Sequence, residues 1–127
     1  MLSTMMNTPL GVSTLHRFGA RHFATSRVGD YDGEQIRWRS YAEIDADSAS
    51  LAQALTNLGI EAGDRVGTFM WNSTEHLEAY LAVPSMGCVL HTLNCRLSAE
   101  HVAYIINHAS DRFMILDARL IDSFLSV

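Results

Sequence analysis

The stretch HLEAYLAVPSMGCVLHTLNCRLSAEH (residues 76–101) decides the fold. Its first part has the apolar spacing of a helix, in which Pro84 predicts a kink or an early end. Gly87 then lets the chain turn into the short apolar strand CVLHT (88–92), and Ser98 is a helix-capping residue that starts the next helix. Helix, strand and helix follow one another through short connections, which is the order of an α/β protein.

Two further apolar strands lie on either side of this stretch, RVGTFM (65–70) and RFMILD (112–117). Neither alternates cleanly, as expected when both faces of a strand are covered. Together they predict a three-layer α/β fold whose sheet is mostly parallel, with right-handed crossovers and flanking helices. Three such strands leave a long apolar edge open, which natural proteins avoid, so we expect this sheet to be an incomplete part of a larger doubly wound domain. The last residues, LIDSFLSV (120–127), begin a further helix.

The residues before these strands predict a turn, a strand and a helix. GDYDG (29–33) is typical of a turn, and EQIRWRSY (34–41) alternates like a half-buried strand with Ile36 and Trp38 on one side. Ser40 and Glu43 have the spacing of a capping box. The helix that follows runs to about Asn57, and Gly59 supplies a left-handed stop. Its expected inward stripe consists of Ile44, Leu51, Leu55 and Leu58.

The first 29 residues contain no acidic side chain. Residues 1–25 therefore have two interpretations: an amphipathic first helix of the domain, or an N-terminal extension such as a mitochondrial transit peptide. The first interpretation places Leu15, Phe18 and Phe23 toward the core. Because no secretory signal precedes the domain, the predicted location is cytoplasmic, with mitochondrial targeting as the alternative.

Composition excludes several classes of chemistry. All nine basic residues are arginine, so the chain has no lysine for a Walker-type phosphate loop, a Schiff base or a clamp on an acyl-adenylate. The formal net charge is −5 and no basic patch is evident, which argues against a nucleic-acid partner. No apolar run approaches the roughly 20 residues of a membrane span, so no transmembrane segment is predicted.

The histidines and cysteines do not have the spacing of a metal site. Cys88 and His91 point to opposite faces of one strand, and His101 and His108 lie about 10 Å apart along one helix. No metal ligand and no catalytic residue is therefore predicted, and both Cys88 and Cys95 are expected to be free thiols. His76 is expected in the first turns of its helix, partly solvated.

Two residues near the carboxyl ends of the strands are candidates for ligand binding. His91 ends a strand at the edge where open α/β folds bind ligands, although a structural role is the alternative. Arg96 follows in the next loop, just before a helix N-terminus, where a guanidinium could meet an anion. The alternative for Arg96 is a solvated loop residue that pairs with Glu100.

Three stretches carry a resemblance to a known family: MWNSTEHLEAYLAVPSMG (70–87), VLHTLNCRLS (89–98) and AYIINHASDR (103–112). With the looser run before them, they resemble the amino-terminal region of AMP-forming acyl-CoA synthetases, in the fatty-acid–CoA ligase branch of the adenylate-forming enzymes. The resemblance covers roughly residues 10–125. It implies that residues 1–127 are the first part of the large N-terminal domain of such an enzyme.

The resemblance also implies a function for the complete protein. Such ligases use ATP and Mg²⁺ to convert a fatty acid or other carboxylate to an acyl-adenylate, and then transfer the acyl group to CoA. Their phosphate loop and catalytic lysine come after the region matched here, so this chain is expected to be inactive alone and to bind no cofactor tightly. In long-chain members the N-terminal segment contributes to a dimer, so residues 1–25 could form a homodimer contact.

The one site residue that the resemblance carries over is Arg96, as a contact for a CoA phosphate. The family usually has Asn-Pro-Arg-Leu where this chain has Asn94, Cys95, Arg96 and Leu97. Cys95 in place of proline loosens this loop. Two other interpretations stay open: a small flavodoxin-like module that binds a nucleotide or a protein without catalysis, and an interaction protein that uses its open apolar edge. The chain lacks the glycine-rich G-x-G-x-x-G turn after a strand that the nucleotide-binding module would need.

Overall fold

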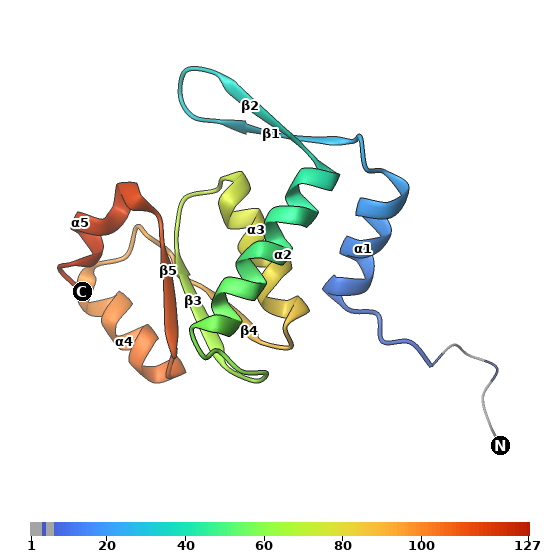
Figure 1. Ribbon diagram of the computed structural model, residues 1–127. Coiled ribbons are helices and arrows are strands. Elements are labelled where there is room, and N and C mark those ends of the chain that lie inside the picture. The colour runs from blue at the N-terminus through green and yellow to red at the C-terminus, as the bar shows by residue number, and fades with distance from the viewer. Residues whose placement is uncertain (1–3, 5–6) are drawn as a thin grey trace.

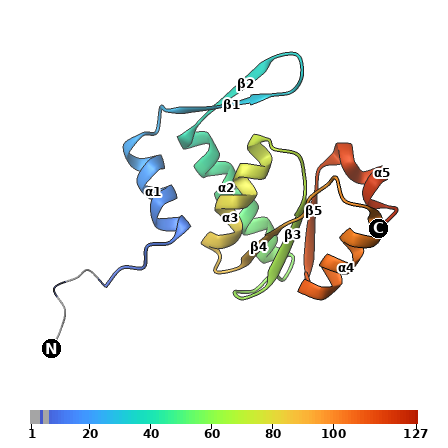
Figure 2. The ribbon, with the colours of Figure 1, turned by 180° about the vertical axis from the view of Figure 1, so that it is seen from behind.

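The protein is described by a computed structural model covering Thr4 and residues 7–127. A three-stranded sheet lies between two helical layers (Figures 1 and 2). The sheet consists of β3 (Arg65–Phe69), β4 (Val89–Thr92) and β5 (Phe113–Leu116). One face carries α2 (Tyr41–Asn57) and α3 (Thr74–Ser85); the other carries α4 (Ala99–Ala109), the 3₁₀ turn η1 (Ala118–Leu120) and α5 (Ile121–Phe124).

All three strands of this sheet are parallel, as the sequence predicts, and their order is β4-β3-β5. Gly67 at the centre of β3 is in register with His91 of β4 and Met114 of β5. Four of the five residues of β3 are buried, whereas β4 and β5 are only partly covered. The predicted α/β class is therefore confirmed, and β4 and β5 are the two edges of the sheet in the described part of the chain.

Two apolar clusters form the core, one on each face of the sheet. Toward α2 and α3 the buried members are Leu55, Ile60, Val66, Val83 and Cys88. Toward α4 and α5 they are Phe69, Leu93, Val102 and Leu120. Because consecutive residues of β3 point to opposite faces, this one strand contributes to both clusters.

The predicted start and end of α2 are both confirmed. The Ser40 side chain accepts from the Glu43 amide while the Glu43 carboxylate accepts from the Ser40 amide, which is the expected capping box. Gly59 follows the helix with φ = 84°. The expected inward position of Leu58 was wrong: this residue is the C-cap, past the last helical turn, and its side chain is exposed.

Helix α3 begins after Ser73, which accepts from the His76 amide, and ends one residue after Pro84, as expected. Its buried face does not carry its largest apolar residues. Tyr80 is exposed, and Leu77 and Leu81 are only half-buried. The buried residues are the small ones and a histidine, namely Thr74, His76, Ala79, Ala82 and Val83. Small side chains let α3 lie close to the sheet.

The region predicted as a turn and one strand is a complete antiparallel hairpin. Strand β1 (Arg27–Tyr31) pairs with β2 (Ile36–Ser40), and the Asp32 carboxylate accepts from the amides of Glu34 and Gln35 in the connecting loop. The prediction of a turn over 29–33 was therefore wrong for its first three residues. Trp38 and Ile36 are exposed rather than half-buried, because the hairpin extends beyond the sheet and the helical layers (Figure 1).

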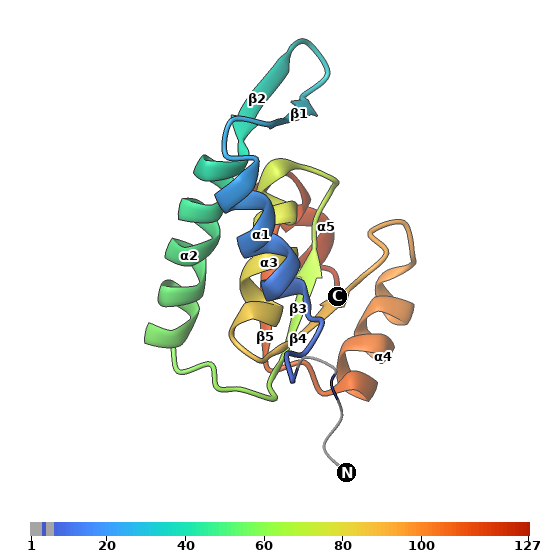
Figure 3. The ribbon, with the colours of Figure 1, turned by 90° about the vertical axis from the view of Figure 1, so that its right-hand side faces the viewer.

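Helix α1 (Val12–His22) confirms that the N-terminal region contains a helix. It packs on the outer side of α2 and α3 (Figure 3). The expected inward orientation was wrong for Phe18 and Phe23, which are exposed. Leu15 does face α2 and α3, where it lines an apolar hollow, although its side chain is still 61 % exposed. Residues 1–3, 5 and 6, which belong to the predicted extension over 1–25, lie outside the described residues. None of the described helices has the length and apolar character needed to cross a membrane.

Candidate functional site

The carboxyl ends of the three parallel strands meet at one edge of the sheet, where open α/β folds bind ligands. The chain leaves β3 through Met70, Trp71 and Asn72, and leaves β4 through the loop that contains Arg96. A hollow opens between these two segments and α3. Its lining residues are Met70, Trp71, Asn72, His76, Tyr80, Thr92, Leu93, Asn94, Cys95 and Arg96.

Arg96 is exposed in this hollow, and its guanidinium carbon lies 6.0 Å from the centre of the Trp71 ring. The Asn94 side chain accepts from the Arg96 amide at 3.0 Å and so shapes the loop. Within the described part of the chain, none of the ion pairs joins Arg96 to Glu100, which was the alternative role. A cation held over an aromatic face keeps its N–H groups available for an anionic ligand.

His76 lies at the base of the same hollow and is buried, not partly solvated as expected. Its Nε2 is 2.9 Å from the hydroxyl of Thr68 on β3. Burial lowers the pKa of His76, and a contact with the Trp71 backbone opposes this only in part. The ring is therefore neutral near pH 7 and joins α3 to the central strand.

A second hollow, which has more charged residues in its lining, lies where β3 and β5 end. The chain first adds β4 on one side of β3 and then adds β5 on the other side. Such a reversal in the strand order is a topological switch point, where a crevice forms at the carboxyl edge. Asp117, directly after β5, accepts from the Arg119 side chain through both carboxylate oxygens, at 3.0 and 2.8 Å. Arg37 of the hairpin reaches the same region and pairs with buried Asp30 and with Glu75.

Hydrogen bonds from Arg119 lower the pKa of Asp117 to about 2, against the effect of burial. A carboxyl group whose pKa is depressed on folding stabilises the protein above its unfolded pKa of 3.8, and this contribution is lost as the pH falls toward 2. Because the Arg119 side chain is 57 % exposed, solvent screening reduces the contribution to about 1–2 kcal/mol.

We expect Asp117→Asn to lower the free energy of unfolding by about 1–2 kcal/mol at pH 6 and by much less at pH 2.5. Urea titrations at the two pH values measure this difference. The matched control is Asp122→Asn, which changes an exposed carboxylate in α5 and should shift stability equally little at both. An equal loss for Asp117→Asn at both pH values would contradict the role of the ionised carboxylate.

The remaining candidates are structural. His91 Nδ1 lies 2.8 Å from a carboxylate oxygen of Asp111, two residues before β5. This histidine therefore joins β4 to the segment that leads into β5, across Gly67, rather than facing the carboxyl edge. Cys88 is buried and donates to the Glu61 carbonyl, while the thiol of Cys95 points to the Met70 carbonyl. Neither forms a disulfide. Among the described residues, no three His, Cys, Asp or Glu side chains gather as a metal site.

The sequence thus predicted Arg96 at the edge of the sheet but not its aromatic partner, nor the buried His76 beneath it. A signal for His76 was present, because it stands three and seven positions before Ala79 and Val83, the residues that face the sheet. Asp117 was also missed. Its position directly after an apolar strand, two residues before an arginine, could have identified it.

Comparison with known proteins gives a consistent result. The family model described as AMP-binding enzyme matches residues 16–126. The chain is 42 % identical over 120 residues to a 3-methylmercaptopropionyl-CoA ligase of Ruegeria lacuscaerulensis, covering 93 % of this chain and 22 % of that protein. It is 41 % identical over 120 residues to a long-chain-fatty-acid–CoA ligase of Thermus thermophilus, covering 94 % of this chain and 22 % of that protein.

A solved structure supports the same fold. The N-terminal subdomain of Klebsiella oxytoca NpsA, determined in complex with 3-hydroxybenzoyl-AMSN, matches with a TM-score of 0.79 over 92 % of this chain and 29 % of that one. At 21 % sequence identity this likeness concerns the fold alone. The chain spans about a fifth of the length of the curated relatives that it matches.

Proposed function

Because the chain belongs to the AMP-binding enzyme family, we propose that it is the N-terminal part of an ATP-dependent acid–thiol ligase. Such an enzyme joins a carboxylate, here a fatty acid or related organic acid, to CoA through an acyl-adenylate. The observation that carries the proposal is the identity of 41–42 % to two CoA ligases along more than nine-tenths of the chain.

Within that ligase, the role of this chain is to frame the active site and to supply one ligand contact. The chain has no lysine for the adenylate. Among the residues that the structure describes, no side chain at the carboxyl edge is arranged as a nucleophile with a base and a third group that orients the base. ATP and Mg²⁺ therefore depend on residues outside these 127. Arg96 is the contact that we assign to CoA, because its exposed guanidinium over Trp71 suits a phosphate.

The flavodoxin-like alternative shares the strand order, since β4-β3-β5 matches the first three strands of that fold. Topology alone therefore does not separate the two functions. The similarity to CoA ligases along the whole chain favours the ligase, and the carboxyl edge presents an arginine and a tryptophan rather than a glycine-rich phosphate loop.

We expect the isolated chain to catalyse no ATP–pyrophosphate exchange with fatty acids of several lengths, measured against a heat-killed control.

A chimaera tests the function itself. In it, this chain takes the place of the matching N-terminal segment of the T. thermophilus ligase, to which it is 41 % identical. The chimaera should form acyl-CoA in a reaction that depends on both ATP and CoA. Failure of a folded chimaera to do so would contradict the proposal.

Arg96→Ala in this chimaera should raise the KM for CoA about tenfold, because one charge-assisted phosphate contact contributes roughly 1.4 kcal/mol. The exchange reaction with ATP should stay within twofold, since it precedes CoA binding. The control Arg65→Ala removes an exposed arginine from the opposite end of β3 and should change neither reaction. A KM for CoA within twofold of the parent would remove Arg96 from the CoA site.

A further inference from the structure

Phe18 of α1 and the C-cap residue Phe23 form an exposed apolar ridge, which we call the α1 ridge and define as these two residues. Their side chains are 56 % and 53 % exposed, whereas Leu15 lines the apolar hollow between α1 and the helices α2 and α3. Phe18 and Phe23 lie edge to face with ring centres 6.1 Å apart, so the ridge is continuous. A helix of a folded domain ordinarily turns its apolar side inward, and an exposed apolar ridge marks an interaction surface.

The charge beside the α1 ridge is opposite to that of the remaining chain. Residues 1–29 hold three arginines and no acid, whereas residues 30–127 hold all fourteen acidic side chains and six arginines. Arg17 and Arg21 are exposed and share one shallow surface depression with Phe18. The apolar ridge and the positive charge therefore occupy the same face of α1.

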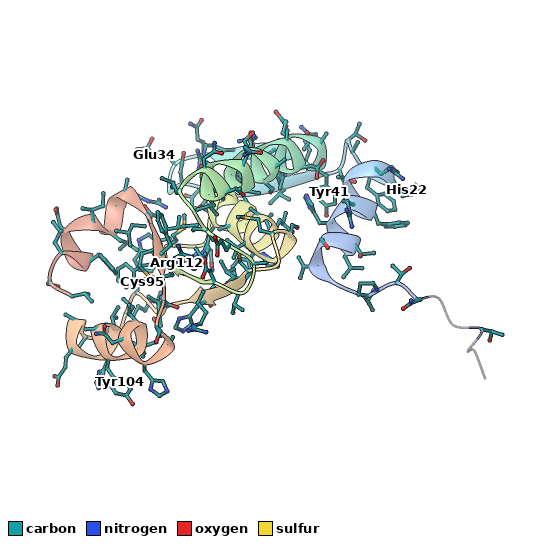
Figure 4. All side chains as sticks on the ribbon, turned by 60° about the horizontal axis from the view of Figure 1, so that its bottom comes forward. His22, Glu34, Tyr41, Cys95, Tyr104 and Arg112 are labelled. Carbon is teal, nitrogen blue, oxygen red and sulfur yellow. The ribbon has the colours of Figure 1, made fainter. Side chains whose placement is uncertain are left out.

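The inner face of α1 is fixed to the domain. His16 Nε2 lies 2.7 Å from the Asp45 carboxylate of α2, and Gly19 lies against the ring of Tyr41. Figure 4 shows Tyr41 on the side of α2 that faces α1. These contacts make α1 part of the fold, on the outer side of α2 and α3 (Figure 3), which argues against a targeting peptide that is cut away. They also hold the α1 ridge in a constant orientation.

We propose that α1 docks the protein on an anionic lipid surface. The apolar side chains of the α1 ridge enter the boundary between headgroups and acyl chains, while Arg17 and Arg21 pair with lipid phosphates. Amphipathic helices with aromatic and aliphatic residues on one side and arginine beside them bind membranes in this way. A second copy fits less well, because a symmetric contact between two ridges would bring arginines of the same sign together.

The test is flotation of the 127-residue chain with vesicles of phosphatidylcholine alone or of phosphatidylcholine and phosphatidylglycerol at 7:3. We expect at least tenfold tighter binding to the anionic vesicles, weakened several-fold by 0.5 M NaCl. F18S/F23S should reduce this binding at least tenfold, and R17E/R21E should abolish the preference for anionic lipid. The control Leu125→Ser changes a leucine that is at least as exposed, at the opposite end of the molecule, and should bind like the parent.

Circular dichroism of each variant verifies that the helices are retained, since all the altered side chains are exposed. Three results would overturn the proposal: absence of binding, equal binding to neutral and anionic vesicles, or an equal loss for Leu125→Ser. Sedimentation velocity supplies a fourth. A dimer that dissociates in F18S/F23S, without binding of the parent to vesicles, would assign the α1 ridge to a second copy of the chain.

Discussion

Phe69→Ala is expected to lower the free energy of unfolding by about 3–5 kcal/mol, the largest effect among the substitutions considered. Phe69 is the last residue of the central strand and is almost fully buried. Its ring packs 5.4 Å from that of Phe124 and contributes to the cluster between the sheet and α4. Alanine would leave a cavity beneath both α4 and α5, because neither the strand nor the helices can close over it.

Urea unfolding followed by circular dichroism measures this loss. Leu125→Ala, an exposed control in the same region, should change the free energy of unfolding by less than about 0.5 kcal/mol. If Phe69→Ala does not fold, Phe69→Leu keeps most of the volume and should cost about 1.5 kcal/mol or less. A loss below about 1 kcal/mol for Phe69→Ala would show that the cluster around Phe69 does not support the fold.

Thr68→Val is expected to destabilise the protein by about 1–3 kcal/mol, even though it preserves the shape of the side chain. Thr68 is fully buried, and its hydroxyl is the partner of His76 Nε2. Valine leaves that ring nitrogen buried without its partner. The double variant Thr68→Val/His76→Leu removes both polar groups and should recover most of the loss, so the two substitutions should be strongly non-additive. Additive losses would contradict the pairing.

The same histidine makes stability depend on pH. Burial lowers the pKa of His76 in the folded protein, so the unfolded chain binds the proton more readily. The stability from this group is complete above the unfolded pKa of 6.5 and decreases as the pH falls through the folded pKa. His76→Leu should flatten the pH dependence of unfolding between pH 7 and pH 5. The exposed control His108→Leu should leave this dependence unchanged.

The sequence was sufficient to predict the three strands of the parallel sheet and the helices that connect them. The strands β3, β4 and β5 are short apolar runs between capping residues and glycines, and these local signals agree with the final packing. The capping box at Ser40 and the left-handed Gly59 similarly depend on neighbours in the chain. Such elements can be predicted because their causes lie within a few residues.

The elements that were missed depend on contacts across the chain. The polar strand β1 is held by pairing with β2, and buried Asp30 accepts from Arg37 and from the amide of Thr74 at the start of α3. The inward face of α3 carries His76 rather than a leucine because Thr68, eight residues earlier, meets its ring. Helical spacing places His76 on the inward face, but nothing in the local sequence identifies Thr68 as its partner. Arg96 was found as a loop residue, but its position over Trp71 follows from two separate strands ending at one edge.

The strand order also determines when the sheet can assemble during synthesis. Strand β3 ends at residue 69, but its two neighbours end only at residues 92 and 116. At about 5–20 residues per second, the ribosome leaves β3, the most buried strand, without either neighbour for roughly one to five seconds. The second neighbour is missing for about as long again. The nascent protein therefore depends on α3 to shield one side of that strand before β4 appears.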